Sequence, residues 1–304
     1  MAETIHTNQF LSNFAVRHKL PHPVADFVAP KMQVKRSSDK YSQYTQDIYR
    51  VYDNAILGRE EAKEIQWEVT EQPYSCDEYG LAKFVSDRKK RNSDTPIAYD
   101  KDAVRYLKTY QAIAREYRVQ QIGGNTGLIP STAIGAAWAT PATGTPVADI
   151  LAAMAQIDAQ IAIPPNKILV PTQVALRMIT CDEWKDYFKH TGEGFGSGLF
   201  SAISGLRHLG LEPMLTSVRG LSTSKGTTSD PTVEEMWSDN VLLFYSEPTP
   251  TLETMTFMYS PYTIADRIST SRPARKRGVF HDIYEEIDEL LVNAYCGRIL
   301  ENCI

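Results

Sequence analysis

The sequence predicts an α+β fold, in which helices and strands are segregated along the 304-residue chain. Three observations predict it. A long amphipathic pattern favours a single helix over residues of about 101–122. Residues of roughly 160–245 alternate short apolar runs with helical patterns, which is typical of a compact mixed α/β unit. After Pro250 the chain is rich in alternating apolar residues, so a second, β-rich part is expected.

The first 45 or so residues show no sustained apolar period, and Pro21, Pro23 and Pro30 interrupt them. Such a segment cannot close a hydrophobic core of its own. We therefore expect it to be either disordered or an arm laid on another surface.

A two-stranded projection is predicted next. Ile65, Trp67 and Val69 alternate with polar residues at the period of a half-exposed strand. An isolated hairpin is only marginally stable in water, so this projection needs a partner surface on which to lie.

The long helix is expected to be capped by Asp100 or Asp102 and to end at Gly123. Its apolar stripe is predicted to contain Val104, Leu107, Ala114 and Tyr117. The charged residues of the opposite side are then Arg105, Lys108, Arg115, Glu116 and Arg118.

A second amphipathic helix begins at Thr145 and Pro146 and stops before the Pro164–Pro165 pair. A short buried strand at 168–170 follows. Two short helices, a third helix that ends at Gly210, and strands within 214–218 and 241–245 complete the predicted α/β unit. Strands are also expected within 254–260, 262–269 and 277–284. The apolar tail, 290–304, is expected to pack beside the long helix.

Composition excludes several classes of protein. The 42% hydrophobic and 23% charged residues fit a soluble globular chain, and the net charge of −5 argues against a broad nucleic-acid-binding face. No apolar run approaches the roughly 20 residues that span a bilayer, and the first residues lack the pattern of a signal peptide. Cys76, Cys181, Cys296 and Cys303 form no zinc spacing and are expected to be reduced, mostly buried thiols.

No enzyme mechanism assembles from the motifs. The run GLSTSKGTT at 220–228 has the wrong order for a phosphate-binding loop, and QIGGNTG ends a helix where a dinucleotide fingerprint would open one. The segment 281–289 gathers His281 and five carboxylates, for which an acidic solvated face is favoured over a cation site. No catalytic residue, cofactor or metal site is predicted.

Two basic runs stand out, RKKR at 88–91 and RPARKR at 272–277. Both are basic enough for phosphate contact or a sorting signal. Exposed turns, or partners for carboxylates on a neighbouring molecule, are the more common roles of such runs.

Residues 237–257 combine a Trp, a polar turn, NVLLFY, a proline break and a threonine-rich β segment. This order resembles the core of tailed-bacteriophage major capsid proteins, which share the Hong Kong 97-type fold. Further segments are similar to the family in the same order. They are FVAPKMQVKRSSDKYSQY (27–44), YSCDEYGLAKFVSDRKKRNSD (74–94), AAWATPATGTPVADILAAMAQI (136–157) with PPNKILVP (164–171), LGLEPMLTSV (209–218), MWSDNVLLFY (236–245) and the tail 290–304.

The resemblance implies an N-terminal arm, an extended β-hairpin loop, a peripheral domain with a long spine helix, and an axial domain. These would occupy residues 1–55, 56–92, 93–160 together with 246–304, and 161–245, respectively. Such subunits form hexamers and pentamers that tile an icosahedral shell around double-stranded DNA. The implied partners are other copies of the chain, scaffolding and portal proteins and a decoration protein. Contact with DNA would be weak and non-specific, no membrane is involved, and the location is the virion, assembled in the host cytoplasm.

Seven residues are candidates for contacts between subunits, and for each charged one a solvated surface role is the alternative. They are Arg59, Glu60, Trp67, Arg115, Glu116, Arg267 and Arg272. Two other functions compete with the viral shell. One is an encapsulin-type compartment with the same fold. The other is an α/β nucleotide- or metal-dependent enzyme that would depend on Lys225 or His281.

Overall fold

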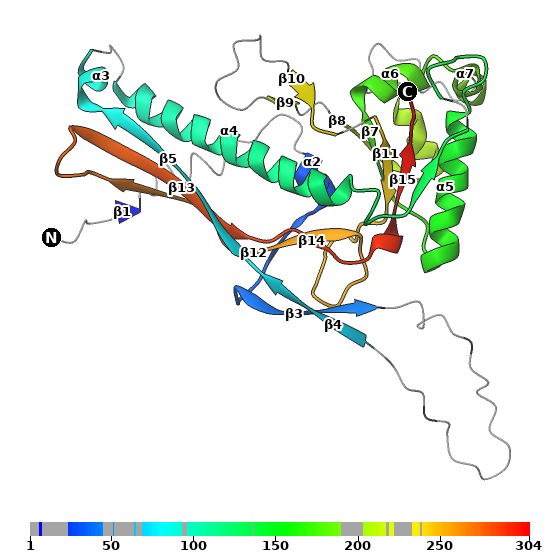
Figure 1. Ribbon diagram of the computed structural model, residues 1–304, viewed down its shortest axis with the longest axis horizontal. Coiled ribbons are helices and arrows are strands. Elements are labelled where there is room, and N and C mark those ends of the chain that lie inside the picture. Colours follow the sequence, from blue (N-terminus) through cyan, green and yellow to red (C-terminus); the bar gives the residue numbers. More distant parts are fainter. Residues whose placement is uncertain are drawn as a thin grey trace.

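The computed structural model describes residues 6–7, 24–44, 51, 64, 69–92, 96–135, 137–189, 203–216, 219–221, 233–237 and 239–304. These residues form an elongated molecule with two parts (Figure 1). One part is a long helix that lies along a twisted sheet. The other, at the opposite end, is a second sheet flanked by shorter helices.

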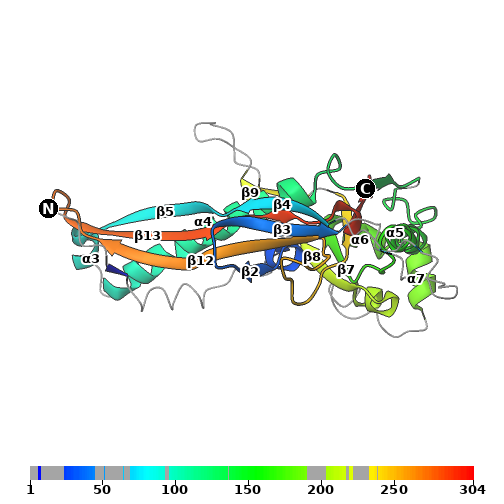
Figure 2. The same cartoon turned by 90° about the horizontal axis from the view of Figure 1, so that it is seen from below.

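The sheet of the long part has six strands, in the order β1-β12-β13-β5, with β2 and β14 also paired to β12. Their bounds are β1 His6–Thr7, β2 Lys31–Gln33, β5 Asp77–Ser86, β12 Met258–Ser271, β13 Gly278–Ile287 and β14 Leu290–Leu291. β13 and β5 stay in antiparallel register from Gly278 opposite Ser86 to Ile287 opposite Asp77. This unbroken pairing makes the sheet a long, narrow platform, and Figure 2 shows its strands side by side with α4 behind them.

Helix α4, Pro96–Gly123, lies against this sheet and ends at the predicted glycine. Val104 and Leu107 pack on Ile268 and Ile283, as the amphipathic pattern predicted. The rest of the predicted stripe is wrong, because Ala114 and Tyr117 are exposed. Gln111, Arg115 and Glu116 are buried in their place. The buried face is polar here because another part of the chain packs on it, as described below.

The outer side of α4 carries an uncharged aromatic row. Tyr99, Tyr106, Tyr110 and Tyr117 are all exposed, and their spacing of seven, four and seven residues places them on one face of a helix. None of the helices in the described ranges combines the length and the apolar composition needed to cross a bilayer.

The second part contains a five-stranded sheet in the order β6-β15-β11-β7-β8. Its strands are β6 Ser131–Ala133, β7 Lys167–Pro171, β8 Glu212–Thr216, β11 Val241–Phe244 and β15 Gly297–Glu301. The surrounding helices are α5 Pro146–Ile161, α6 Thr172–Met178, α7 Asp182–Phe188 and the 3-10 turns η2 Ser204–Leu209 and η3 Ala294–Cys296. A small hairpin, β9 Arg219–Leu221 with β10 Val233–Glu235, lies beside it. The main hydrophobic core fills this part and includes Trp138, Trp184, Phe188 and Phe244.

The C-terminal tail lies elsewhere than predicted. β15 pairs with β11 and β6 inside the five-stranded sheet, and it does not return to the long helix. Ile299 and Leu300 are both buried although they point to opposite faces of the strand. A strand that is apolar on both faces is suited to a central position covered on both sides.

The predicted projection exists, but with other boundaries. β3, Ser38–Tyr44, pairs antiparallel with β4, Val69–Ser75, to form a two-stranded ribbon. β3 comes from the segment assigned to the arm, and β5, assigned to the loop, belongs to the six-stranded sheet. Ile65 and Trp67 lie outside the described residues. A small core of Tyr41, Tyr74, Cys76, Tyr259 and Val292 joins the ribbon to the sheet.

Candidate functional site: the arm, the ribbon and their anchors

The N-terminal arm is anchored to the C-terminal half of α4. The short arm helix α2, Val24–Val28, buries Val24, Ala25 and Val28. The Arg115 guanidinium forms an ion pair with Asp26, and its Nη2 donates to the Ala29 carbonyl oxygen at 2.8 Å. Beside it, Glu116 Oε1 accepts the Ala25 backbone N–H at 2.8 Å. Two adjacent charged residues of α4 thus hold the arm in place.

Glu116 occupies an unusual environment for a carboxyl group. Burial raises its pKa to about 7, although the backbone N–H groups of Ala25 and Val24 and the Arg115 charge all oppose the shift. Its second oxygen, Oε2, has no hydrogen-bond partner within the described part of the chain. The protonation state of Glu116 therefore changes near neutral pH, at the point where the arm docks.

The sequence candidates for contacts between subunits divide into three groups. Arg115 and Glu116 are only 5% and 1% exposed, and the contacts given above for them are within the chain. Arg59, Glu60 and Trp67 lie outside the described residues. Arg267 and Arg272 are at the surface. Arg272 Nη2 lies 2.6 Å from Asp87 Oδ2, and the Arg267 guanidinium lies 5.7 Å from the centroid of the Tyr284 ring.

The acidic segment 281–289, expected to be a solvated face, contributes half of its charged residues to the interface with α4. His281, Glu285 and Glu289 are buried, because alternate side chains of a strand share one face and this face meets the helix. His281 Nε2 lies 2.7 Å from Asp100 Oδ1. Lys31 Nζ of the arm donates to Glu285 at 3.1 Å.

Arg118 completes this interface at the other end of α4. Its Nε and Nη2 both donate to the Glu289 carboxylate, at distances down to 2.8 Å. The guanidinium also lies 3.7 Å from the centroid of the Tyr79 ring. No group of three or more possible metal ligands occurs among the described residues. All four cysteines are free and buried, as predicted.

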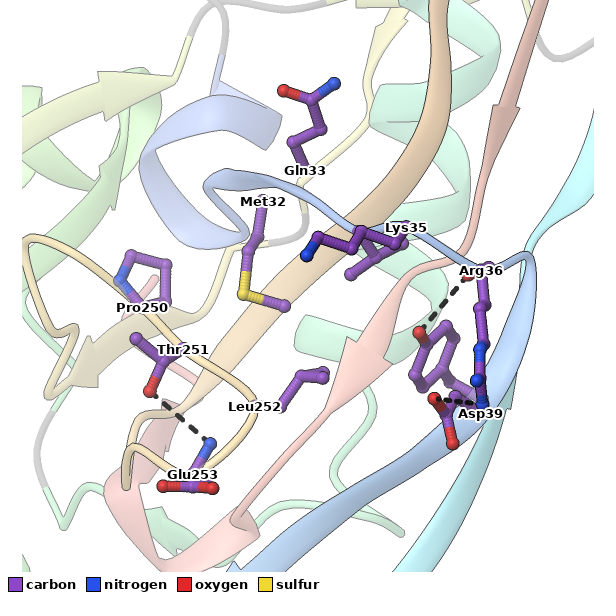
Figure 3. Close-up of a pocket in the computed structure, with 11 residues that line it drawn as sticks. Met32, Gln33, Lys35, Arg36, Asp39, Pro250, Thr251, Leu252 and Glu253 are labelled. Carbon is purple, nitrogen blue, oxygen red and sulfur yellow. Dashed lines mark hydrogen bonds and ion pairs between the residues drawn. The ribbon is translucent and has the colours of Figure 1, made fainter.

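A cavity of about 790 Å³ lies where the arm, the ribbon and the 250–253 loop meet (Figure 3). Its apolar members are Met32, Val34, Tyr74, Pro250 and Leu252, and its polar ones are Gln33, Lys35, Arg36, Asp39, Thr251 and Glu253. Tyr74 is fixed by a hydrogen bond from its hydroxyl group to the Arg36 carbonyl oxygen at 3.2 Å. The lining is therefore mixed, with four charged side chains, Lys35, Arg36, Asp39 and Glu253, around the apolar ones.

The residues that sequence reasoning missed are the partners in these anchors. Asp26 was not singled out, Asp100 was expected only as a helix cap, and Glu289 was expected only on a solvated face, because their roles here depend on pairings more than 80 residues apart in the chain. The candidate nucleotide residue Lys225 lies outside the described residues.

No family model matches the sequence, and no curated protein matches it. Solved structures do match. A phage-related protein from Bordetella bronchiseptica is 17% identical with a TM-score of 0.76, and the match covers 100% of this chain and 99% of that one. The capsid protein of cyanophage P-SCSP1u is 11% identical with a TM-score of 0.61 (93% and 88% covered). The capsid of a native gene transfer agent (GTA) particle is 10% identical with a TM-score of 0.61 (93% and 91% covered). The chain therefore has the Hong Kong 97-type fold that phage capsid structures share.

Proposed function

We propose that this chain is the major capsid protein of a tailed bacteriophage, a structural protein without enzymatic activity. It assembles with itself as hexamers and pentamers into an icosahedral shell that encloses double-stranded DNA. The observation that carries the proposal is the extent of the structural match, since at least 93% of this chain superposes on solved capsid subunits. A match over nearly the whole elongated chain is informative because an isolated monomer gains little from such a shape.

The ribbon gives the proposal a physical basis. β3 and β4 pair with each other, and no third strand pairs with either one within the described ranges. A two-stranded sheet is marginal in water. Its attachment to the body consists of the small tyrosine core and a few hydrogen bonds, such as Ser42 N–H to the Leu252 carbonyl oxygen at 3.0 Å. We infer that the ribbon is completed by lying on a neighbouring subunit.

The magnitude of such contacts suits a shell. A standard interface buries about 1,600 Å² and would gain roughly 40 kcal/mol at about 25 cal/mol per Å². Lost rotational freedom and side-chain ordering offset most of this gain. Several modest interfaces per subunit then make an assembly that is strong collectively, while each contact remains reversible enough to correct errors.

The domain assignment follows the same reasoning. The part built on α4 and the six-stranded sheet corresponds to the peripheral domain, and the five-stranded sheet with its helices corresponds to the axial domain. β3 and β4 form the extended loop, and residues up to about 37 form the arm. Scaffolding, portal and decoration proteins are the expected partners, and the virion is the expected location.

The test is direct imaging of the purified full chain, alone and with its scaffolding protein, by negative-stain electron microscopy. Uniform hollow particles are expected, and cryo-electron microscopy should show hexamers and pentamers in them. Encapsidation is scored by nuclease-protected DNA in particles from infected cells. A chain that stays monomeric or dimeric under all assembly conditions, scaffold included, refutes the proposal.

A further inference from the structure

The two basic runs come together at one end of the long part (Figures 1 and 2). The first, 88–91, forms most of helix α3, Asp87–Arg91. The second, 272–277, is the turn between β12 and β13. Ser86 stands opposite Gly278 in the sheet, and the Asp87 backbone N–H donates to the Arg277 carbonyl oxygen at 3.2 Å. We call residues 83–92 together with 271–277 the basic tip.

The basic tip is a compact structure. A Cβ added at Gly278 would come within 2.4 Å of the Val85 carbonyl oxygen, so the turn packs tightly on the end of β5. Lys276 Nζ lies 5.3 Å from the centroid of the Phe280 ring. Arg272 bridges to Asp87 across the two segments. The charges are therefore presented on a defined surface.

The concentration of charge at the tip is high. Its seventeen residues contain nine Lys and Arg side chains and one carboxylate, a formal charge of +8. Since the whole chain has a net charge of −5, the remainder carries −13. Two of the cations are used internally, Lys90 with Asp100 and Arg272 with Asp87. The other seven are exposed and pair with no carboxylate of the described residues, namely Lys83, Arg88, Lys89, Arg91, Arg275, Lys276 and Arg277.

A surplus of carboxylates lies at the other end of β5. Glu78 and Glu286 stand directly opposite each other in the β5–β13 pairing and share one face of the sheet. Asp77 is the next residue along the strand, at the same end of the sheet but on its other face. Like charges opposite one another in a sheet are destabilising, so this acidic patch (Asp77, Glu78 and Glu286) is suited to a cationic partner. Asp77 and Glu78 are exposed, and no ion pair joins either one to a cation of the described residues.

The tip and the patch of one molecule do not meet. Eight residues of extended strand separate Ser86 from Glu78, a distance of roughly 27 Å at about 3.4 Å per residue. We propose that the basic tip of one copy binds the acidic patch of a neighbouring copy in the shell. This inference rests on the proposed function. The contact joins two different surfaces, so it is heterologous and can close rings of subunits.

A phosphate backbone is the competing partner for the tip, and the charge distribution favours a second copy. The remainder of the chain carries a net charge of −13 and would repel a nucleic acid that approached the tip. The same negative charge on a second copy would attract the tip. Complementary charges at an interface mainly accelerate association and fix orientation, and their effect weakens as salt rises.

The test reverses the charge of two exposed tip residues, Arg275→Glu and Arg277→Glu. Assembly is followed by light scattering at about 50 mM and about 500 mM salt, with Arg177→Glu and Lys189→Glu in the other part as a matched control. We expect the tip variant to assemble at least tenfold more slowly at low salt and to lose the salt dependence of the wild type, because steering by charge changes association rates by about 10- to 1,000-fold. The control should assemble like the wild type.

A charge swap identifies the partner. Adding Asp77→Lys and Glu78→Lys to the tip variant should restore assembly, because the complementary pair is rebuilt with opposite signs. If the tip variant assembles as fast as the wild type, the inference is overturned and the shell proposal remains intact. Failure of the swap, together with loss of nuclease-protected DNA from tip-variant particles, overturns it in favour of phosphate contact.

Absence of shells from the wild-type chain would refute the proposed function, and the contact between tip and patch could still be tested by itself. The tip variant and the Asp77→Lys, Glu78→Lys variant are then mixed at low salt and examined by sedimentation velocity. Each protein retains one intact half of the contact with wild-type charges, so the mixture should sediment faster than a matched mixture of the tip variant with itself. Equal sedimentation overturns the inference.

Discussion

Replacing Glu116 with Gln should strengthen docking of the arm above neutral pH. Burial raises the pKa of this carboxyl group from 4.5 to about 7 in the folded chain. A group whose pKa is raised on folding favours the folded state at low pH, and that contribution is lost as the pH rises through the folded value. Above pH 7 the buried carboxylate is charged, and this lowers the free energy of unfolding. The difference between its pKa values, 4.5 and about 7, corresponds to roughly 3 kcal/mol.

Gln removes this cost and keeps the contact, because its Oε1 still accepts the Ala25 N–H. Between pH 6 and pH 8.5 this one group should lower the free energy of unfolding of the wild type by about 1.4 kcal/mol, with no such contribution in Glu116→Gln. Urea unfolding at the two pH values measures the difference, and hydrogen exchange of the α2 amides locates it. Glu253→Gln, at an exposed position outside both proposed contact surfaces, is the control, and it should lose as much stability between pH 6 and 8.5 as the wild type.

Two results would refute this reasoning. If Glu116→Gln loses as much stability between pH 6 and 8.5 as the wild type, the buried carboxyl is not the group that titrates. If the variant is less stable than the wild type at pH 8.5, the attraction of the carboxylate to Arg115 and to the arm outweighs its desolvation.

Two further predictions contrast matched sites. Gly278→Ala should lower the free energy of unfolding by about 1–3 kcal/mol through overpacking, since its Cβ would meet a backbone oxygen at 2.4 Å. Gly80→Ala, in the paired strand, should be tolerated better, because its Cβ would have no contact under 3.6 Å. Thermal melting of both variants checks this, and equal losses of stability contradict it. Arg118→Met should cost about 3–5 kcal/mol because it leaves Glu289 buried without its partner. Arg36→Met, at an exposed ion pair, should cost no more than about 1 kcal/mol in the same urea titration, and a cost equal to that of Arg118→Met would refute the argument from burial.

Elements with a complete local signature could be predicted from the sequence. α5 carries Pro146 in its first turn and a regular apolar stripe, and β7 and β11 are short apolar runs bounded by turn residues. In these three elements the pattern within a dozen residues was sufficient, because each element buries a face that its own sequence defines. α4 was predicted only in part: its end at Gly123 is correct, but the helix begins at Pro96, so Asp100 and Asp102 lie inside it and do not cap it.

The ribbon and the anchors of the arm could not be predicted, because they depend on contacts between residues distant in the chain. β3, with the sequence SDKYSQY, has too few apolar residues to be read as a strand, and it becomes one by pairing with β4. Arg115 and Glu116 were assigned to the solvent side of α4, and the docking of α2 turns that position into an interior. Charged residues on a helix have the same local signature in either environment, so only the tertiary contact decides between them.

The ionic anchors along α4 bear on how neighbouring subunits would fit. Asp100 contacts His281 near the basic tip, and Arg118 contacts Glu289 near the acidic patch. From Asp100 to Arg118 the helix advances by eighteen residue steps, or about 27 Å at about 1.5 Å per residue, which is nearly the length of strand that separates the tip from the patch. The helix is thus fastened to the sheet at both ends of the segment that joins the two proposed contact surfaces. Loss of the Arg118–Glu289 pair, whose carboxylate is buried, would cost about 3–5 kcal/mol, so a bend between the two proposed contact surfaces is opposed and their spacing within one molecule is held nearly fixed.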